Sequence, residues 1–241
     1  MLLRTLTKFK NAKQLIKDDI FRIYANRLIF KAGIWFVDIP RTSSSSVKVL
    51  LNSIYGWPYG KSNIFEKEYS NNTVYPDHLT VEELIKCFGL RNWRKLKKFT
   101  IIRHPYERAH SNYYYLLKAK RIHPSLKFKD FIYCIYDNYL GKTIWEFLAN
   151  KKVWMPQTDF LVSNKQISGD IKLIKFGEKR NLEIFRFLDS EFIQDEKINL
   201  KIQSCRNPQS IKEFENDLDE ESKKILQVIY DSDFKNFEFM R

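Results

Sequence analysis

The sequence has few cysteines and no long hydrophobic run. Its three cysteines, Cys87, Cys134 and Cys205, are odd in number, far apart and form no metal-ligand pair. This usage argues against a disulfide framework and favours reduced thiols, as in a cytosolic protein. No stretch approaches the length of about 20 apolar residues that a membrane-spanning helix needs. The N-terminal segment also lacks the uninterrupted apolar core of a signal peptide, so we expect a cytoplasmic protein.

Acidic residues are fewer than basic ones. Lys and Arg number 42 against 29 Asp and Glu, which gives a net charge of +13. Such an excess favours an anionic partner, such as nucleic acid, a phosphate-rich cofactor, an acidic glycan or a membrane surface, although a generic basic surface would also carry it. Hydrophobic residues (44%) and aromatic residues (15%) are abundant, which argues for a folded globular chain and against disorder.

The length and the uniform composition predict a single domain. A chain of 241 residues fits one large domain or two small ones and can bury a full core. No internal repeat and no long linker divides it. We therefore predict one domain over residues 1–241, with a helical extension at residues 1–33 that has the charge pattern of a basic amphipathic helix.

Apolar runs and helical periodicities alternate along the chain, which predicts an α/β fold. The predicted strands cover residues 34–39, 97–105 and 171–176. The predicted helices cover residues 43–54, 80–89, 106–120, 127–149 and 179–190 and the C-terminal tail, with a loop at 56–77. Thr80 and Glu83 form a capping-box pattern, and Gly89 is a stop signal for the same helix.

A run of four serines follows the first predicted strand, in "WFVDIPRTSSSS" at residues 35–46. The first N–H groups of a helix have no acceptor within the helix, and its dipole directs positive charge at the preceding turn, so this layout favours a bound anion. Small residues let the backbone approach a phosphate, and Arg41 adds a fixed charge. In the alternative interpretation, Ser43 is only the helix cap.

A second segment has the same layout. "FTIIRHPYERAHSNYYY" at residues 99–115 reads as a strand, a basic turn and a helix. Ser111 lies eight residues after Arg103, about two helical turns into the predicted helix, so both could hold one anion. Alternatively, Arg103 pairs with a carboxylate and Ser111 is a buried helix serine. Two such units in one chain indicate a ligand with two phosphate-bearing ends.

Two other patterns are weaker. "GWPYGKS" at residues 56–62 has three residues between its glycines, where a nucleotide-binding P-loop needs four, and it does not follow a strand. The basic stretches at residues 91–98 and 118–129 contain aromatic residues, as nucleic-acid sites do. They would equally suit an acidic polysaccharide or a solvated helix face.

The two anion-binding motifs resemble those of sulfotransferases. "IPRTSSSS" resembles their 5′-phosphosulfate loop, and "IIRHPYERAHSNYYY" resembles their 3′-phosphate motif. The similarity is greatest to the carbohydrate O-sulfotransferases that include the heparan and chondroitin uronosyl enzymes. It extends to "DHLTVEEL", "MPQTDFLV", "KFGEKRNLEIF" and "VIYDSDFKNFEF", and so covers about residues 34–239. It implies a P-loop-like sulfotransferase fold, with a central, mainly parallel sheet flanked by helices.

The resemblance implies transfer of a sulfuryl group from 3′-phosphoadenosine 5′-phosphosulfate to a hydroxyl of a carbohydrate, without a metal. The residues predicted to bind this donor are Arg41, Thr42, Ser43, Ser44, Ser45, Ser46, Arg103, Ser111 and Arg206. Arg41 replaces the lysine of the family, His104 replaces an asparagine, and Ser43 and Ser44 replace glycines. Serine is acceptable at these two positions if neither needs a positive φ.

Transfer needs a base for the acceptor proton and positive charge for the leaving phosphate. We predict His78 as the base and Arg41 as the positive group. His78 precedes a capped helix, has a suitable pKa range and matches a histidine of the family that the resemblance marks as catalytic. A lone loop histidine is more often solvated, and Glu178 or Asp77 would be the next candidates. Of the other histidines, His104 lies in the donor turn.

The acceptor is not identified by the sequence. A glycan or glycolipid is expected, a tyrosine-bearing peptide stays open, and no nucleic acid is expected. Peripheral contact with an anionic surface also stays open. Two alternative functions are a nucleotide-dependent kinase-like phosphoryl transferase, which would need a Walker loop and magnesium carboxylates, and a non-enzymatic polyanion-binding protein, which would not need the ordered motifs.

Overall fold

The computed structural model describes residues 31–55, 78–188 and 217–240. Three parallel strands form a sheet in the order β1-β2-β5: β1 (Ile34–Phe36), β2 (Lys97–Ile102) and β5 (Ile171–Lys175). Trp35 pairs with Lys98 across the first ladder, and Thr100 pairs with Leu173 across the second. The central strand β2 therefore has neighbours on both sides, and the carboxyl ends of all three strands meet at one edge of the sheet.

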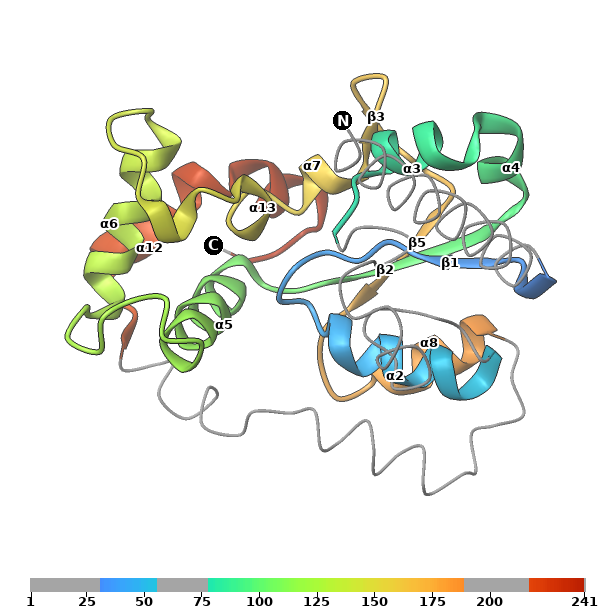
Figure 1. The fold of residues 1–241 in the computed structure, drawn as a ribbon, viewed down its shortest axis with the longest axis horizontal. Helices are drawn as coiled ribbons and strands as arrows, with labels where there is room; N and C mark the ends of the chain where they lie inside the picture. The colour runs from blue at the N-terminus through green and yellow to red at the C-terminus, as the bar shows by residue number, and fades with distance from the viewer. Residues whose placement is uncertain (1–30, 56–77, 189–216, 241) are drawn as a thin grey trace, which may run out of the picture.

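Helices cover both faces of this sheet (Figure 1). The helices α2 (Ser44–Tyr55) and α8 (Arg180–Leu188) lie below the sheet in this view, and α3 (Val81–Phe88) and α4 (Leu90–Lys95) lie above it. The helices α5 (Pro105–Lys118), α6 (Phe128–Tyr139) and α12 (Glu220–Ile229) lie beyond the carboxyl ends of the strands, to the left. The fold is thus mixed α/β, with a small parallel sheet flanked by helices, as predicted.

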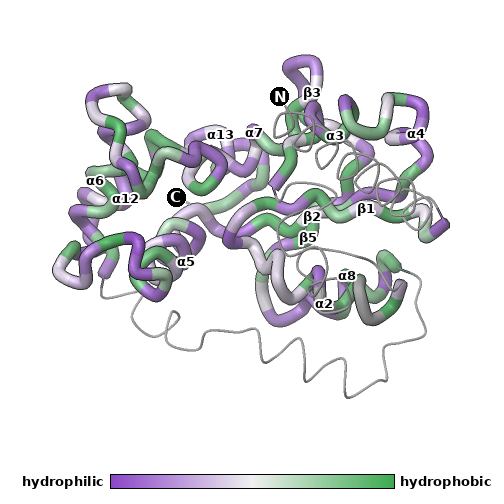
Figure 2. The backbone as a smooth tube through the Cα atoms, in the orientation of Figure 1, coloured by the Kyte–Doolittle hydropathy of each residue, from purple (hydrophilic) through white to green (hydrophobic). Residues whose placement is uncertain are grey.

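Short elements connect these layers. They are the 3₁₀ turns η1 (Glu146–Leu148) and η2 (Lys151–Val153), α7 (Thr158–Leu161), the strands β3 (Val162–Ser163) and β4 (Gln166–Ile167), and α13 (Asp231–Asn236). The strands β3 and β4 pair as an antiparallel hairpin. In Figure 2 the strands of the sheet carry hydrophobic stretches, and the hairpin turn is hydrophilic.

Two hydrophobic clusters stabilise the two halves. The first joins the sheet to α2, α3 and α8, and its fully buried members include Phe36, Leu51 and Phe99. The second joins α5, α6, α12 and α13 around Phe131 and Leu226. Each large aliphatic or aromatic side chain contributes about 1.5–3 kcal/mol when fully buried. The edge where the strands end therefore lies between two independently packed regions.

The sequence predicted the start of α3 correctly. Thr80 Oγ1 accepts from Glu83 N at 3.2 Å, and the Glu83 carboxylate accepts from Thr80 N at 2.7 Å, which completes the capping box. Gly89 ends the helix with a φ of 77°, as a stop signal should. Pro105 occupies the first turn of α5, also as predicted. These local signals hold because they depend only on neighbouring residues.

The helix predicted at residues 127–149 is wrong in its second half. The helix α6 ends at Tyr139, and Gly141 follows with a φ of 68°. Lys142 N donates to Asp137 O at 2.9 Å, the backbone bond of a Schellman motif with glycine in the left-handed position. The apolar periodicity continues past Gly141, but those side chains belong to η1.

Some predictions lie outside the described residues. They include most of the helical extension at 1–33, the loop at 56–77 and Arg206. The sequence also left α4 and the β3–β4 hairpin unpredicted. Among the helices that the structure describes, each one is too short or too polar to cross a bilayer.

Candidate functional site

The turn between β1 and α2 is held by its own side chains. Thr42 Oγ1 and Ser44 Oγ both donate to Ile39 O, at 2.9 and 3.0 Å. Val47 N donates to Ser43 O, so Ser43 is the last residue before the helix and the N–H groups of the serines after it begin the helix. These first N–H groups have no acceptor within α2 and are available to an anion. Ser45 is exposed there and Ser46 is buried.

Ser43 has a φ of 94°, and Arg41 has a φ of 67°. Serine can replace glycine at position 43 without strain only if no positive φ is needed, and that condition is not met. A side chain at such an angle stores about 1–3 kcal/mol of strain, because Cβ crowds the backbone. Ser44 is within α2 and does not share the problem. The first turn is therefore strained at one of the two positions where serine replaces glycine.

Arg41 reaches from the first turn to the helix that follows β2. Its Nη2 donates to Ser111 Oγ at 3.2 Å, and its guanidinium carbon lies 4.5 Å from the centre of the Tyr115 ring. Arg103 approaches the same place, since its Nη1 lies 3.4 Å from Arg41 O. The structure thus brings together Arg41, Arg103 and Ser111, which the sequence had assigned to two separate motifs.

Arg103 has a carboxylate partner. Its Nε donates to Glu107 Oε2 at 3.1 Å, one helical turn along α5, and its guanidinium stacks over Phe176 at 4.2 Å. The structure therefore contains the ion pair between Arg103 and a carboxylate that the alternative interpretation proposed. Glu107 is well exposed and occupies Nε, so the outer nitrogen atoms still point toward Arg41. Ser111 is buried, which the alternative for that residue also proposed.

The backbone of Arg103 is fixed by residues distant in the sequence. Gln157 accepts from Arg103 N at 2.9 Å and donates to Arg103 O at 2.8 Å. Gln157 is in turn held by Asp233, which is fully buried and accepts from Gln157 N at 2.9 Å and from Thr158 N at 2.8 Å. Arg108 adds a further link, because it donates to Pro40 O and to Met155 O, at 3.0 and 2.9 Å. The second turn is therefore locked from outside.

A third basic residue, which the sequence analysis did not assign, reaches the first turn. Arg180 begins α8, directly after β5, and its Nη1 contacts Ser43 Oγ. It is almost fully buried and lies near the Phe176 ring. The signal was available, because "IKLIKFGEKRNLEIF" is a third strand, basic turn and helix. Parallel strands end at one edge, so three such units deliver three arginines to one place.

Positive charge is concentrated at this edge. Within the described ranges, Glu107 is the one carboxylate at ion-pair distance from Arg41, Arg103 or Arg108. Burial and the nearby guanidinium of Arg103 lower the pKa of Arg41 to about 10. Burial lowers the pKa of Arg103 as well, against the attraction of Glu107. Buried cations that repel one another are stabilised by an anion, so the site is suited to a ligand with several negative charges.

A second ionic group lies at the end of β1. The Asp38 carboxylate is buried, forms an ion pair with Lys48 at 2.7 Å and lies 3.2 Å from His78 Nδ1. Burial alone would raise the pKa of Asp38, but His78 and Lys48 outweigh it and lower the pKa to about 2. His78 Nδ1 also lies 3.2 Å from the backbone O of Asp38, and when Nδ1 carries the proton and donates to this carbonyl, Nε2 of the neutral ring is left as an acceptor. His78 is thereby oriented at the same edge as Arg41. Asp38 and Lys48 were not singled out from the sequence.

The two histidines near or within α5 have structural partners. His104 caps this helix by accepting from Tyr106 N, and its Nε2 lies 2.9 Å from Met240 O. His110 is buried, with Nε2 3.2 Å from Asp217. Neither ring is placed like that of His78. Among the residues that the structure describes, no three His, Cys, Asp or Glu side chains gather so that they could hold a metal ion.

Comparison with known proteins agrees with this arrangement of strands and turns. A family model described as "Sulfotransferase family" matches residues 30–240, which is most of the chain and includes all three turns. No curated protein and no solved structure matches the chain. Since the match spans far more than half of the sequence, the chain belongs to the sulfotransferase family.

Proposed function

We propose that the protein transfers a sulfuryl group from 3′-phosphoadenosine 5′-phosphosulfate to a hydroxyl of a carbohydrate. The observation that carries this proposal is the contact between Arg41 and Ser111, beside Arg103. It joins the turn after β1 to the helix after β2, so one ligand with two anionic ends would be held by both. A nucleotide with a phosphate on the 3′ position and a phosphosulfate on the 5′ position is such a ligand.

In this proposal the two turns hold opposite ends of the donor, as in a P-loop-like fold. The 5′-phosphosulfate lies at the start of α2, against the N–H groups and hydroxyls of residues 42–46. Arg103 and Ser111 hold the 3′-phosphate, and Arg180 adds charge at Ser43. Arg41 lies between the two ends and can serve either, because its fork of donors suits phosphate oxygens. Arg206, also assigned to the donor, lies outside the described residues.

The reaction follows from the same geometry. The acceptor oxygen forms a bond to sulfur while the bond from sulfur to the bridging phosphate oxygen breaks. His78 Nε2 takes the acceptor proton, and Asp38 keeps His78 Nδ1 protonated, so that Nε2 is the free base. Arg41 stabilises the negative charge that grows on the leaving phosphate. Asp38 acts through His78 and is a positioning residue.

The carbohydrate acceptor rests on the resemblance to the uronosyl sulfotransferases. A glycan or a glycolipid fits this resemblance, and nucleic acid does not. The kinase-like alternative predicts binding of ATP with magnesium, and the polyanion-binding alternative predicts binding of heparin without a nucleotide. Calorimetric titrations with the bisphosphate, with ATP and magnesium, and with heparin distinguish these functions.

Calorimetry with adenosine 3′,5′-bisphosphate tests the donor site. The wild-type chain should bind this bisphosphate without magnesium and more tightly than ATP. Arg103→Ala should weaken binding roughly 10- to 100-fold, because it removes a charge-assisted contact to phosphate worth about 1.5–3 kcal/mol. Arg94→Ala, at an exposed position of α4, is the matched control and should bind normally. Equal affinity for both variants, or preference for ATP with magnesium, would overturn the assignment.

A further inference from the structure

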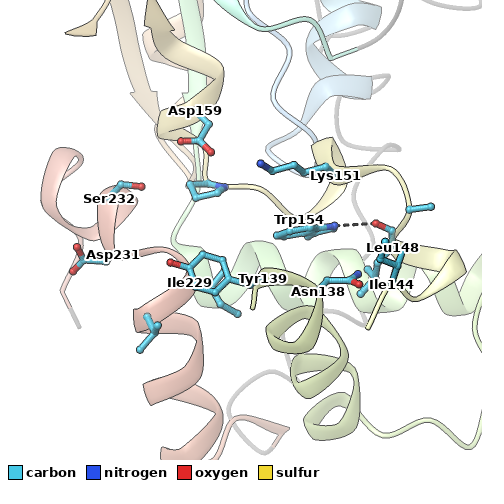
Figure 3. Close-up of a pocket in the computed structure, with 13 residues that line it drawn as sticks. Asn138, Tyr139, Ile144, Leu148, Lys151, Trp154, Asp159, Ile229, Asp231 and Ser232 are labelled. Atoms are coloured by element: carbon cyan, nitrogen blue, oxygen red, sulfur yellow. Dashed lines mark hydrogen bonds between the residues drawn. The ribbon is translucent and has the colours of Figure 1, made fainter. Parts of the chain in front are cut away.

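A cavity lies apart from the arginine cluster, which is the group formed by Arg41, Arg103 and Arg180 at the ends of the strands. It has a volume of about 640 Å³ and opens between the end of α6, the η1–η2 segment, the start of α7 and the junction of α12 with α13. Figure 3 shows the side chains that line it. This volume is within the range of small-molecule sites, about 300–1,000 Å³, so it can hold a compact ring of several heavy atoms.

The inner surface of the cavity is apolar and aromatic. The Trp154 ring is fixed by a hydrogen bond of 2.9 Å from Nε1 to Leu148 O. Pro156 and Ile229 line the cavity beside it, and Tyr139 and Ile144 are exposed at its rim. Such a surface favours the flat C–H face of a ring, since that face loses little hydration on contact.

Polar groups without partners surround this apolar surface. The Tyr139 hydroxyl, Lys151 Nζ, the Asp159 carboxylate and the Ser232 hydroxyl make no hydrogen bond or ion pair with any residue that the structure describes. Asn138 Nδ2 is buried and also lacks a partner there, while its Oδ1 accepts from Trp145 N at 3.1 Å. A buried polar atom is normally hydrogen-bonded, so Asn138 Nδ2 is suited to an acceptor of a ligand, and the exposed groups of Tyr139, Lys151 and Asp159 can exchange water for ligand hydroxyls.

The charge of the lining selects among such ligands. The lining includes two carboxylates, Asp159 and Asp231, and one lysine, Lys151, and Asp231 also forms an ion pair with Lys235 at 2.7 Å. Burial and the nearby Asp233 raise the pKa of Asp159, so a further negative charge would be unfavourable beside it. A sulfated or uronic acid ring is therefore disfavoured, in contrast to the arginine cluster. We propose that this cavity is a binding site for a neutral sugar ring of a glycan.

One chain segment separates the two sites. In residues 154–159, Met155 and Gln157 bond to Arg108 and Arg103 on one side. Trp154, Pro156 and Asp159 line the cavity on the other side. The sugar site therefore has its own lining and does not depend on the proposed donor. The cavity and the arginine cluster share residues 154–159 as a common wall. A glycan held in the cavity would therefore begin beside the arginine cluster.

A glycan microarray with neutral and acidic oligosaccharides tests this inference on the full chain. We expect neutral oligosaccharides to bind. Asp159→Asn and Tyr139→Phe should each weaken the binding about tenfold, as the loss of one strong hydrogen bond does. Glu82→Gln, an exposed carboxylate on α3, is the control and should bind as the wild type does. The Trp154 indole N–H resonance should shift when the bound oligosaccharide is added and stay in place with a heparin tetrasaccharide.

Three results would overturn the inference: no neutral glycan bound, only acidic glycans bound, or equal binding by all variants. Melting temperatures establish that each variant is folded, and Tyr139→Phe removes a single exposed hydroxyl, so a folded variant is assured. Bisphosphate affinity should be unchanged in Asp159→Asn. Loss of bisphosphate binding in the wild type with sugar binding retained would contradict the proposed donor and leave the sugar site standing.

Discussion

The turn after β1 and the turn after β2 have the same layout but differ in backbone strain and in the bonds that each makes within itself. The first is bonded within itself and strained, with a φ of 67° at Arg41 and 94° at Ser43. The second has no residue with a positive φ, and Gln157 and Asp233 hold its backbone from distant parts of the chain. Both turns are contacted by distant residues, since Arg108 and Arg180 reach Pro40 and Ser43, but only the first turn is strained.

The two turns are therefore suited to different roles in the proposed reaction. A backbone locked by buried hydrogen bonds suits the binding of a fixed phosphate, because its donors are already in place. The strained turn lies next to Asp38 and His78. The proposed reaction needs side chains there that are already positioned for the transition state. Substitutions in the second turn should therefore affect the whole fold. Those in the first should affect the site more than the fold.

The largest effect is expected from Asp233→Ala. The change leaves the N–H groups of Gln157 and Thr158 and the Thr158 hydroxyl without their buried acceptor. Each buried donor left without its acceptor costs about 1–3 kcal/mol in the free energy of unfolding, and this change leaves three. Urea denaturation measures this loss. Glu220→Ala, on the exposed surface of α12, is the control and should change stability little.

His78→Ala should affect rate and leave donor affinity intact. Removal of a general base lowers turnover by about 100-fold or more, while the bisphosphate contacts stay. Turnover with radiolabelled donor and calorimetry with the bisphosphate measure the two quantities separately. His123→Ala, at an exposed position, should match the wild type in both. Normal turnover in His78→Ala would place the base elsewhere.

Acid should weaken the first turn through Asp38. Its pKa is about 2 in the folded protein against a usual value of 3.8, so the unfolded chain binds its proton first as the pH falls. The stabilisation is fully present above about pH 4 and is lost as the pH falls through about 2. It amounts to about 2 kcal/mol, at 1.36 kcal/mol per pKa unit.

Unfolding measured against pH for the wild type and Asp38→Asn checks this. The difference in free energy of unfolding between them should shrink by about 2 kcal/mol over that window. A difference that is constant with pH would show that the ion pairs with Lys48 and His78 contribute no stability.

The smallest effect is expected at Ser43. Glycine normally destabilises a protein relative to alanine, by about 0.4–1 kcal/mol, because its unfolded chain is freer. At a φ of 94° the order should invert, since alanine keeps the strain and glycine removes it. Both variants lose the contact with Arg180. We expect Ser43→Gly to be about 1 kcal/mol more stable than Ser43→Ala in thermal unfolding, and the reverse order would contradict the strained turn.

The sequence predicted the elements whose signals are local. The capping box at Thr80, Pro105 in the first turn of α5 and the three strands of the sheet follow from adjacent residues and hydrophobic runs. The end of α6 was missed because apolar periodicity outweighed Gly141. The β3–β4 hairpin was missed because its turn places Asn164 and Lys165 at positive φ, and lysine gives no such signal.

The candidate site was predicted as two separate motifs. Their convergence could not be read from spacing, because it depends on the order of parallel strands in the sheet. Arg180 was missed although its strand and helix were expected, since the sequence does not say which side chain turns inward. The links from Asp38 to His78 and from Gln157 to Asp233 join residues far apart in the chain, and only the fold brings them together.

The bond from Gln157 to Asp233 also has a consequence for how the protein is synthesised. A growing chain emerges from its amino end, and its parts fold as they become available. The strands of the sheet would be present long before Asp233, which lies 76 residues after Gln157. Until Asp233 emerges, Arg103 would lie beside a glutamine that nothing orients. The sheet can thus assemble early in translation, whereas a competent anion site waits for the last helix.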